Sequence, residues 1–172
     1  MQSHEQIERL FMEAYEEHAD RLFRFLALKV SDREKAKDLL QDVFVRTWEY
    51  LCRGQKIAHM SSFLFRVARN LVVDEYRRAK SASLDELLEN GVLAEDVYSD
   101  EGGTIFSEAR EAMEGLSRLS PEAREVIEMR YFGGLGPKEI AAVLGESENT
   151  ISVRLNRALK KLREILKYET NH

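Results

Sequence analysis

The chain is poor in the residues that build cross-linked or β-rich proteins. Its 172 residues include one cysteine, Cys52, which excludes an internal disulfide and a cysteine-based zinc site. Two prolines and nine glycines are few for a β-sandwich or a barrel. The histidines His4, His18, His59 and His172 lack the spacing of metal ligands. We therefore expect neither a metal nor a cofactor.

Long apolar runs are also missing. No stretch approaches the length of about 18 apolar residues that a membrane-spanning helix needs, so we expect no membrane insertion. The first residues are polar and lack the basic and apolar segments of a signal peptide. Together with the single cysteine, these absences predict a reducing, cytoplasmic setting.

Positive charge is not in excess either. The chain has 26 Lys and Arg against 31 Asp and Glu, a net charge of −5, which argues against a protein that coats DNA by bulk charge. Residues 81–110 hold one cation and eight anions, whereas 1–80 hold 15 cations and 13 anions, and 111–172 hold ten of each. We therefore expect two domains, 1–80 and 111–172, joined by a flexible acidic linker at 81–110.

Apolar residues recur three or four positions apart over most of the chain, which is the spacing of amphipathic helices. Ser31, with Glu34 three residues later, has the form of a capping box at a helix start. Ser61 or Ser62 is suited to cap the following helix. With no strand pattern in view, the sequence predicts an all-α fold of two small helical domains.

A helix-turn-helix spacing occurs in the last third of the chain. Pro137–Leu144 predicts a first helix, Gly145 a left-handed turn, and Ser147 the N-cap of a second helix that starts near Glu148. This second helix carries six cations and two anions over 148–167, a basic face that suits a phosphate backbone. An ordinary helical hairpin with a solvated charged face is the alternative at this point.

A helical wheel separates the faces of the second helix. Ile151 and Leu155 share the side that we expect to be core, and Val153 faces the opposite side. There it would contact a thymine methyl group in the major groove, or be one ordinary exposed apolar residue. The candidate DNA-contacting residues are Ser147, Asn149, Thr150, Ser152, Val153, Arg154, Asn156, Arg157, Lys160 and Lys161.

Several motifs follow one another in a set order. They are Asp38–Trp48, Phe63–Arg78, Leu119–Glu122, Lys138–Ala141 and Arg154–Ala158. This order resembles that of bacterial RNA polymerase sigma factors of the extracytoplasmic-function (ECF), two-domain type. The most specific part is Ala68–Leu71 followed by Asp74.

The resemblance implies an initiation factor that binds core RNA polymerase and directs it to promoter DNA. The first domain would open the −10 region, and the second would read the −35 element. The helix Asp38–Trp48 would dock on the clamp helices of the largest polymerase subunit. The implied polymerase-binding residues are Asp38, Gln41, Asp42 and Arg46. The implied −10 contacts are Arg66, Arg69, Asn70, Asp74, Tyr76, Arg77 and Arg78. Because this family often uses an anti-sigma factor, we also expect such a partner.

The residue chemistry agrees with a strand-opening role. Residues 66–80 hold five cations and two anions, which suits the backbone of a single strand. We expect Phe63 and Phe65 to pack in the core, whereas Tyr76 is open to either core packing or base contact. Glu146 stands where the family has an apolar turn residue, and we expect it to loosen packing at the turn.

Two other functions fit parts of the sequence. A stand-alone helix-turn-helix regulator would bind an operator without polymerase, but it leaves Asp38–Arg78 as scaffold. A helical interaction protein with no nucleic-acid role fits the acidic charge but not the basic helix. We expect no enzyme, because Gly133–Lys138 follows a helix and lacks the Gly-Lys-Ser/Thr sequence of a phosphate loop.

Overall fold

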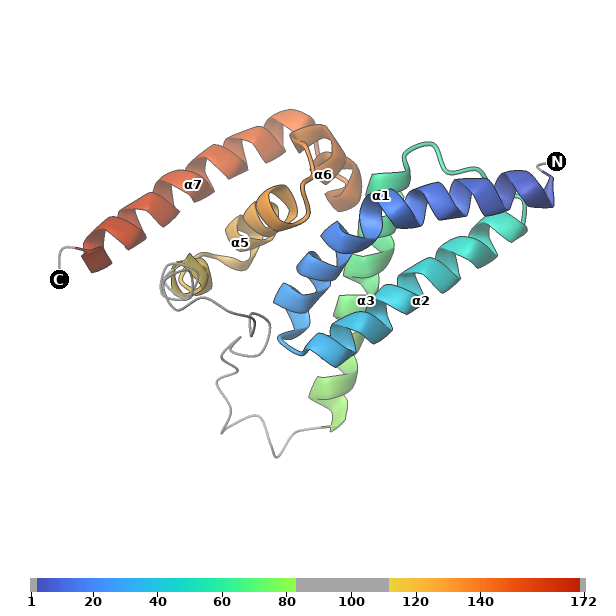
Figure 1. Ribbon diagram of the computed structural model, residues 1–172. Coiled ribbons are helices and arrows are strands. Elements are labelled where there is room, and N and C mark those ends of the chain that lie inside the picture. The colour runs from blue at the N-terminus through green and yellow to red at the C-terminus, as the bar shows by residue number, and fades with distance from the viewer. Residues whose placement is uncertain (1–2, 83–111, 171–172) are drawn as a thin grey trace. The chain divides into compact units, whose positions relative to one another are not determined.

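The computed structural model describes residues 3–82 and 112–170, and every regular element within them is helical (Figure 1). These residues form two compact units, one on each side of the segment 83–111. The all-α fold class is confirmed, and the expected acidic linker lies almost wholly outside the described residues. Nowhere in 3–82 and 112–170 is a helix long and apolar enough to cross a membrane.

The first unit is built from three helices, α1 (His4–Val30), α2 (Arg33–Cys52) and α3 (Met60–Ala82), each of which contacts the other two. Figure 1 shows α1 and α2 running side by side, with α3 against both. Phe65 is fully buried and packs against Phe25 with 5.4 Å between ring centroids, as expected for a core residue. Phe63 is half-buried and packs against Tyr50 with 4.8 Å between ring centroids and the rings tilted by 46°.

The junction between α1 and α2 differs from the prediction. Ser31 ends α1 with φ at 52°, and its N–H donates to the carbonyl of Ala27. Asp32 has the extended backbone that an N-cap needs, and its carboxylate accepts from the N–H of Lys35 at 3.0 Å. The predicted capping box at Ser31 is wrong because a residue that closes one helix in the left-handed region cannot also cap the next.

The third helix begins earlier than predicted. Its first residue is Met60, and the N–H of Phe63 already donates to the carbonyl of His59 at 3.1 Å. Ser61 and Ser62 therefore lie inside the first turn and are not the N-cap. Ser62 is buried, so its small side chain lets the start of α3 approach the rest of the unit.

The second unit packs short helices against one long helix, and a π-helix continues one of the short ones. Its elements are the helical residues 112–117, α5 (Pro121–Ile127), η1 (Glu128–Phe132), α6 (Pro137–Leu144) and α7 (Glu148–Thr170). Both α5 and α6 pack on α7. Figure 1 shows α7 as the longest helix of this unit, with its amino-terminal end beside α6. Buried Ile140 and Ile151 join α6 and α7 in the core.

The helix-turn-helix has the predicted bounds. Gly145 closes α6 with φ at 70°, a conformation that favours glycine. The hydroxyl of Ser147 accepts from the N–H of Thr150 at 3.1 Å and so caps the start of α7. Local signals in the chain, namely a proline at the first helix start and a glycine and serine in the turn, are sufficient to position both helices.

Candidate nucleic-acid and protein interfaces

The outer face of α2 carries a polar stripe. All four residues predicted there are exposed, namely Asp38, Gln41, Asp42 and Arg46. Their neighbours Leu39 and Val43 are buried, which fixes the orientation of the helix. Spacings of three and four residues place the four polar side chains on one face, as a docking surface requires.

An apolar residue missed by the sequence analysis lies within this stripe. Val45 is 55% exposed and comes three residues after Asp42 and one before Arg46. We call Asp38, Gln41, Asp42, Val45 and Arg46 the α2 stripe. The sequence signal that could have found Val45 is the one that marked Val153, a β-branched residue on the polar face of an amphipathic helix.

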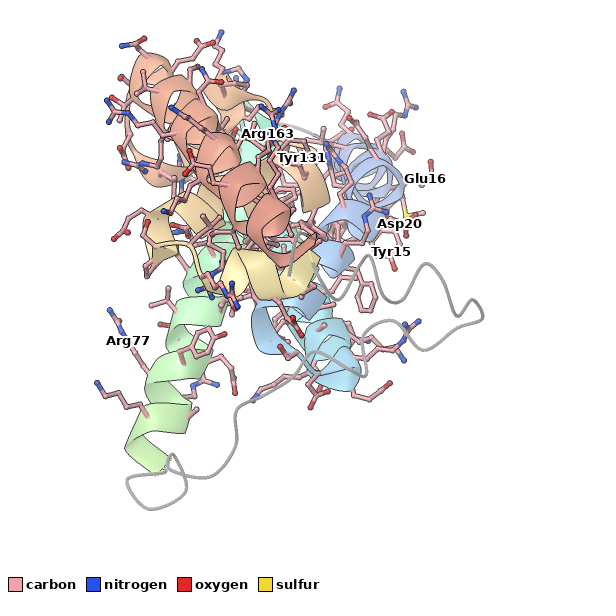
Figure 2. All side chains as sticks on the ribbon, turned by 90° about the vertical axis from the view of Figure 1, so that its left-hand side faces the viewer. Tyr15, Glu16, Asp20, Arg77, Tyr131 and Arg163 are labelled. Carbon is pink, nitrogen blue, oxygen red and sulfur yellow. The ribbon has the colours of Figure 1, made fainter. Side chains whose placement is uncertain are left out.

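A second exposed stripe follows α3. It contains Arg66, Asn70, Val73 and Arg77, which we call the α3 stripe, and all four are exposed at spacings of four, three and four residues. Figure 2 shows Arg77 projecting outward from α3. Val73, 36% exposed, was not among the predicted contacts. Of the other predicted residues, Arg78 is exposed, whereas Arg69 and Asp74 are half-buried beside the stripe.

Tyr76 connects two helices of the first unit. Its side chain is exposed, yet its hydroxyl donates to the carbonyl of Lys29 near the end of α1. Next to it, Glu75 forms an ion pair with Lys35 of α2. These two contacts hold α3 against the α1–α2 junction. The residue is 57% exposed, so its ring does not pack in the core, and its contact with a base stays a prediction.

The predicted face of α7 is exposed. Val153 is 39% exposed although it is apolar, and Asn156, Arg157, Lys160 and Lys161 are exposed around it. Ser152 is half-buried at the edge of this face, while Ile151 and Leu155 are buried as the wheel predicts. We call Ser152, Val153, Asn156, Arg157, Lys160 and Lys161 the α7 face.

Two of the predicted DNA contacts, Ser147 and Thr150, stabilise the start of α7. The hydroxyls of Ser147 and Thr150 lie 2.7 Å apart and hydrogen-bond to each other. Because Ser147 also caps the helix, these side chains fix the direction in which α7 leaves the turn. Asn149, between them, is exposed.

A groove of about 730 Å³ runs beside α7 and is bounded on its other side by residues 118–123. Its cations are Arg118, Arg154, Arg157 and Lys161, and its single carboxylate is Glu122. Such a groove suits an anionic ligand. Sequence analysis missed Arg118, because nothing local shows that a residue 36 positions before Arg154 in the chain faces the same groove.

The turn residue Glu146 forms a bidentate ion pair with Arg154. The Nη1 and Nη2 atoms of Arg154 donate to Oε1 and Oε2 of Glu146 at 2.9 and 2.6 Å. These hydrogen bonds hold the pKa of the Glu146 carboxyl below its ordinary value and raise the pKa of Arg154. The expectation that Glu146 loosens the turn is not met, because its carboxylate links the turn to α7.

These features define a class of protein, an all-helical protein of two units with a helix-turn-helix and a basic groove in its second unit. The family described as sigma-70 region 2 matches residues 14–82. The family described as sigma-70 region 4 matches residues 109–162. Each match covers one of the two units, in the order of the α2 and α3 stripes followed by the α7 face.

The chain belongs to the ECF RNA polymerase sigma factors. It is 31% identical over 150 residues to the ECF sigma factor SigL of Mycobacterium tuberculosis, covering 87% of this chain and 84% of SigL. It is 28% identical over 168 residues to the sigma factor YlaC of Bacillus subtilis, covering 95% and 94%. The sigma factor RpoE from Bartonella quintana, solved with the anti-sigma factor NepR, superposes with a TM-score of 0.72 at 25% identity, covering 92% of this chain and 98% of RpoE.

The chain is therefore an initiation factor that binds core RNA polymerase and directs it to promoter DNA. A stand-alone regulator is not favoured, because its function would leave the region 2 match over 14–82 without a role. The expected motifs in Asp38–Trp48 and Phe63–Arg78 both lie within that match.

Proposed function

We propose that this sigma factor uses three separate surfaces, one to bind polymerase and two to bind promoter DNA. The α2 stripe binds the clamp helices of the largest polymerase subunit. The α3 stripe, with Arg69, Asp74, Tyr76 and Arg78 around it, contacts the −10 region. The α7 face reads the −35 element. The corresponding domains are 1–80 and 111–172, joined by the linker 81–110.

One observation carries this proposal: each surface exposes a valine among polar residues. Val45, Val73 and Val153 are 55%, 36% and 39% exposed, and they lie in the α2 stripe, the α3 stripe and the α7 face. An isolated exposed valine is common. In each of these surfaces, however, the valine is surrounded by hydrogen-bonding and charged groups. Protein interfaces have the same arrangement, an apolar centre with a polar rim.

The chemistry of the α3 stripe suits a separated strand. Arg66 and Arg77 supply cations for the phosphates, and Asn70 between them offers both a donor and an acceptor to an unpaired base. The exposed ring of Tyr76 adds a stacking surface beside the stripe. These groups favour unpaired bases, whose faces and Watson–Crick edges are hidden in a duplex.

The α7 face separates into two kinds of contact. Ser152, Val153 and Asn156 reach base edges in the major groove, where Val153 meets a thymine methyl group. Lys160 and Lys161 bind phosphates, and Arg157 is the cation best placed to reach a base. Phosphate contacts hold the helix in register, whereas base contacts give the promoter preference.

The cellular location of this protein follows from that of core polymerase. Core polymerase is cytoplasmic in bacteria, so we place the protein there. The structural relative RpoE is described in complex with an anti-sigma factor. By that analogy, an anti-sigma protein holds this chain inactive until a signal releases it.

The test of the polymerase-binding surface is a charge reversal at Asp42. We expect Asp42→Lys to weaken binding to core polymerase by about tenfold or more, because it reverses a charge in the centre of the surface that the proposal buries against polymerase. The measurement is titration of labelled full chain with core polymerase. Glu16→Lys is the matched control, because Glu16 is an exposed carboxylate of α1 that points outward from the unit (Figure 2).

The folded state should not change in either variant, since both positions are exposed. Thermal unfolding checks this. If Asp42→Lys binds core polymerase as tightly as Glu16→Lys does, then the α2 stripe is not the docking surface and the assignment fails.

A further inference from the structure

The Glu146–Arg154 pair lies at the end of the surface that the proposed function assigns to DNA. Arg154 lines the groove beside α7 together with Arg157 and Lys161, whereas Glu146 belongs to the turn that precedes the helix. The side chain of Arg154 is 26% exposed and that of Glu146 is 33% exposed. The pair is therefore partly shielded from solvent but still accessible from the groove.

The backbone of the turn fixes the position of the carboxylate. Gly145 adopts a left-handed conformation, and the N–H of Glu146 donates to the carbonyl of Ala141 at 3.1 Å. Ser147 then caps α7. Because residues on both sides are held by hydrogen bonds, the side chain of Glu146 leaves a rigid turn and meets Arg154 two helical turns into α7.

The geometry of the pair decides what Arg154 can still bind. An arginine grips a phosphate most strongly with two parallel N–H donors, the same fork that it presents to a carboxylate. In this protein both Nη atoms already donate to Glu146. A phosphate at that fork would have to displace the carboxylate or share the guanidinium with it, against the repulsion between two anions.

We propose that Glu146 is a specificity-determining residue that acts through Arg154. It occupies the phosphate-binding fork of Arg154 and so removes one sequence-independent contact from the −35 surface. The remaining N–H donors of Arg154 stay in the groove at a fixed orientation. Compared with a protein in which Arg154 binds a phosphate, the affinity for any duplex is lower. Base contacts then contribute a larger share of the binding free energy. This inference rests on the proposed role of the α7 face.

The expected effect is a change in salt dependence. When Glu146→Gln removes the carboxylate charge, Arg154 is released to bind a phosphate. The slope of log binding constant against log salt should then steepen by about one, as for one additional phosphate contact. Binding of the full chain to a non-promoter duplex should tighten by about three- to fivefold near physiological salt.

The matched control is Glu148→Gln. Glu148 is exposed in the first turn of α7, only two residues from Glu146, and the substitution changes the net charge by the same amount. It leaves the pair with Arg154 intact. We expect its salt slope to remain that of wild type, so the comparison separates release of Arg154 from general loss of negative charge.

A second comparison uses Arg154→Gln as the background. In that background Glu146→Gln should change the slope no more than Glu148→Gln does, because there is no guanidinium to release. Promoter preference is measured with the same variants in transcription by core polymerase on a pool of promoters. Glu146→Gln should reduce the ratio of preferred to non-preferred promoters, whereas Glu148→Gln should leave it unchanged.

Two results would overturn the inference. Equal slopes for Glu146→Gln and Glu148→Gln would show that Arg154 is not held back by Glu146. An effect of Glu146→Gln that persists without Arg154 would show that it acts by another route. Lys160→Ala separates these failures from failure of the proposed function: it lowers the slope by about one if the α7 face binds DNA. If it has no effect, the face assignment fails and this inference fails with it.

Discussion

At Tyr76 an observed structural contact and a proposed DNA contact fall on one side chain. Its hydroxyl donates to the carbonyl of Lys29, 47 residues earlier in the chain, while 57% of the residue remains exposed. The hydrogen bond connects α3 to the end of α1. More than half of the residue faces solvent, and the proposed base contact would use the ring rather than the hydroxyl.

We predict that Tyr76→Phe separates these functions. Loss of the hydroxyl should lower the free energy of unfolding by about 0.5–1 kcal/mol, near the low end for a hydrogen bond because the site is exposed. The retained ring should preserve strand opening. The measurements are denaturant unfolding of the full chain and permanganate footprinting of the −10 region with core polymerase.

Tyr131→Phe is the control for this substitution. Tyr131 of η1 is 58% exposed, and Figure 2 shows its side chain on the second unit. We expect no measurable loss of stability in that variant. If Tyr76→Phe abolishes opening without affecting stability, the hydroxyl itself contacts DNA and the anchoring role is wrong.

Residue-scale roles were the hardest to predict from sequence. The bond from Tyr76 to Lys29 and the presence of Arg118 in the groove depend on how distant segments pack, which no local pattern shows. Glu146 stands out in the sequence as a charged turn residue, but spacing alone does not identify Arg154 as its partner. The exposure of Val153 was predictable because the helical wheel needs only the residue's own helix.

At the scale of elements, the helices show where local signals are sufficient and where they compete. Pro137, Gly145 and Ser147 predicted both ends of α6 and the start of α7 where the structure has them, because each acts on its own backbone. At the α1–α2 junction two adjacent polar residues could both cap a helix. Ser31 adopts the left-handed conformation and Asp32 takes the cap, a choice set by the packing of both helices.

The α2 helix provides an internal test of its two faces. Val43 is fully buried and Val45 is 55% exposed, although only one residue separates them. We predict that Val45→Ala changes the stability by no more than about 0.5 kcal/mol and weakens binding to core polymerase by about fivefold. Apolar area that should be buried at the polymerase surface is lost in this variant.

The same substitution at Val43 should have the opposite pattern. Val43→Ala should cost about 2 kcal/mol of stability, from lost burial and the cavity it leaves, while the folded protein binds core polymerase normally. Chemical denaturation and a polymerase titration measure both quantities. Unchanged polymerase binding by Val45→Ala would show that Val45 lies outside the interface.

On the scale of the whole molecule, charge distribution explains why this protein works with a partner. A net charge of −5 opposes binding to DNA, and the basic helix α7 offsets it only locally. We therefore expect the chain alone to bind promoter duplex weakly and to need core polymerase for stable binding. The chain directs polymerase to promoters, and we propose that its exposed surfaces make that choice.

The most direct test of this division is transcription from a pool of promoters by core polymerase with the full chain. Wild type should give a defined set of promoters. Asp42→Lys should lower transcription from all of them in equal proportion, because polymerase binding is common to all. Val153→Ala should instead change the order of preference among promoters, with a discrimination of about 1–3 kcal/mol lost at one base position. Should Asp42→Lys reorder the promoters while Val153→Ala lowers them uniformly, the assignment of the two surfaces would be contradicted.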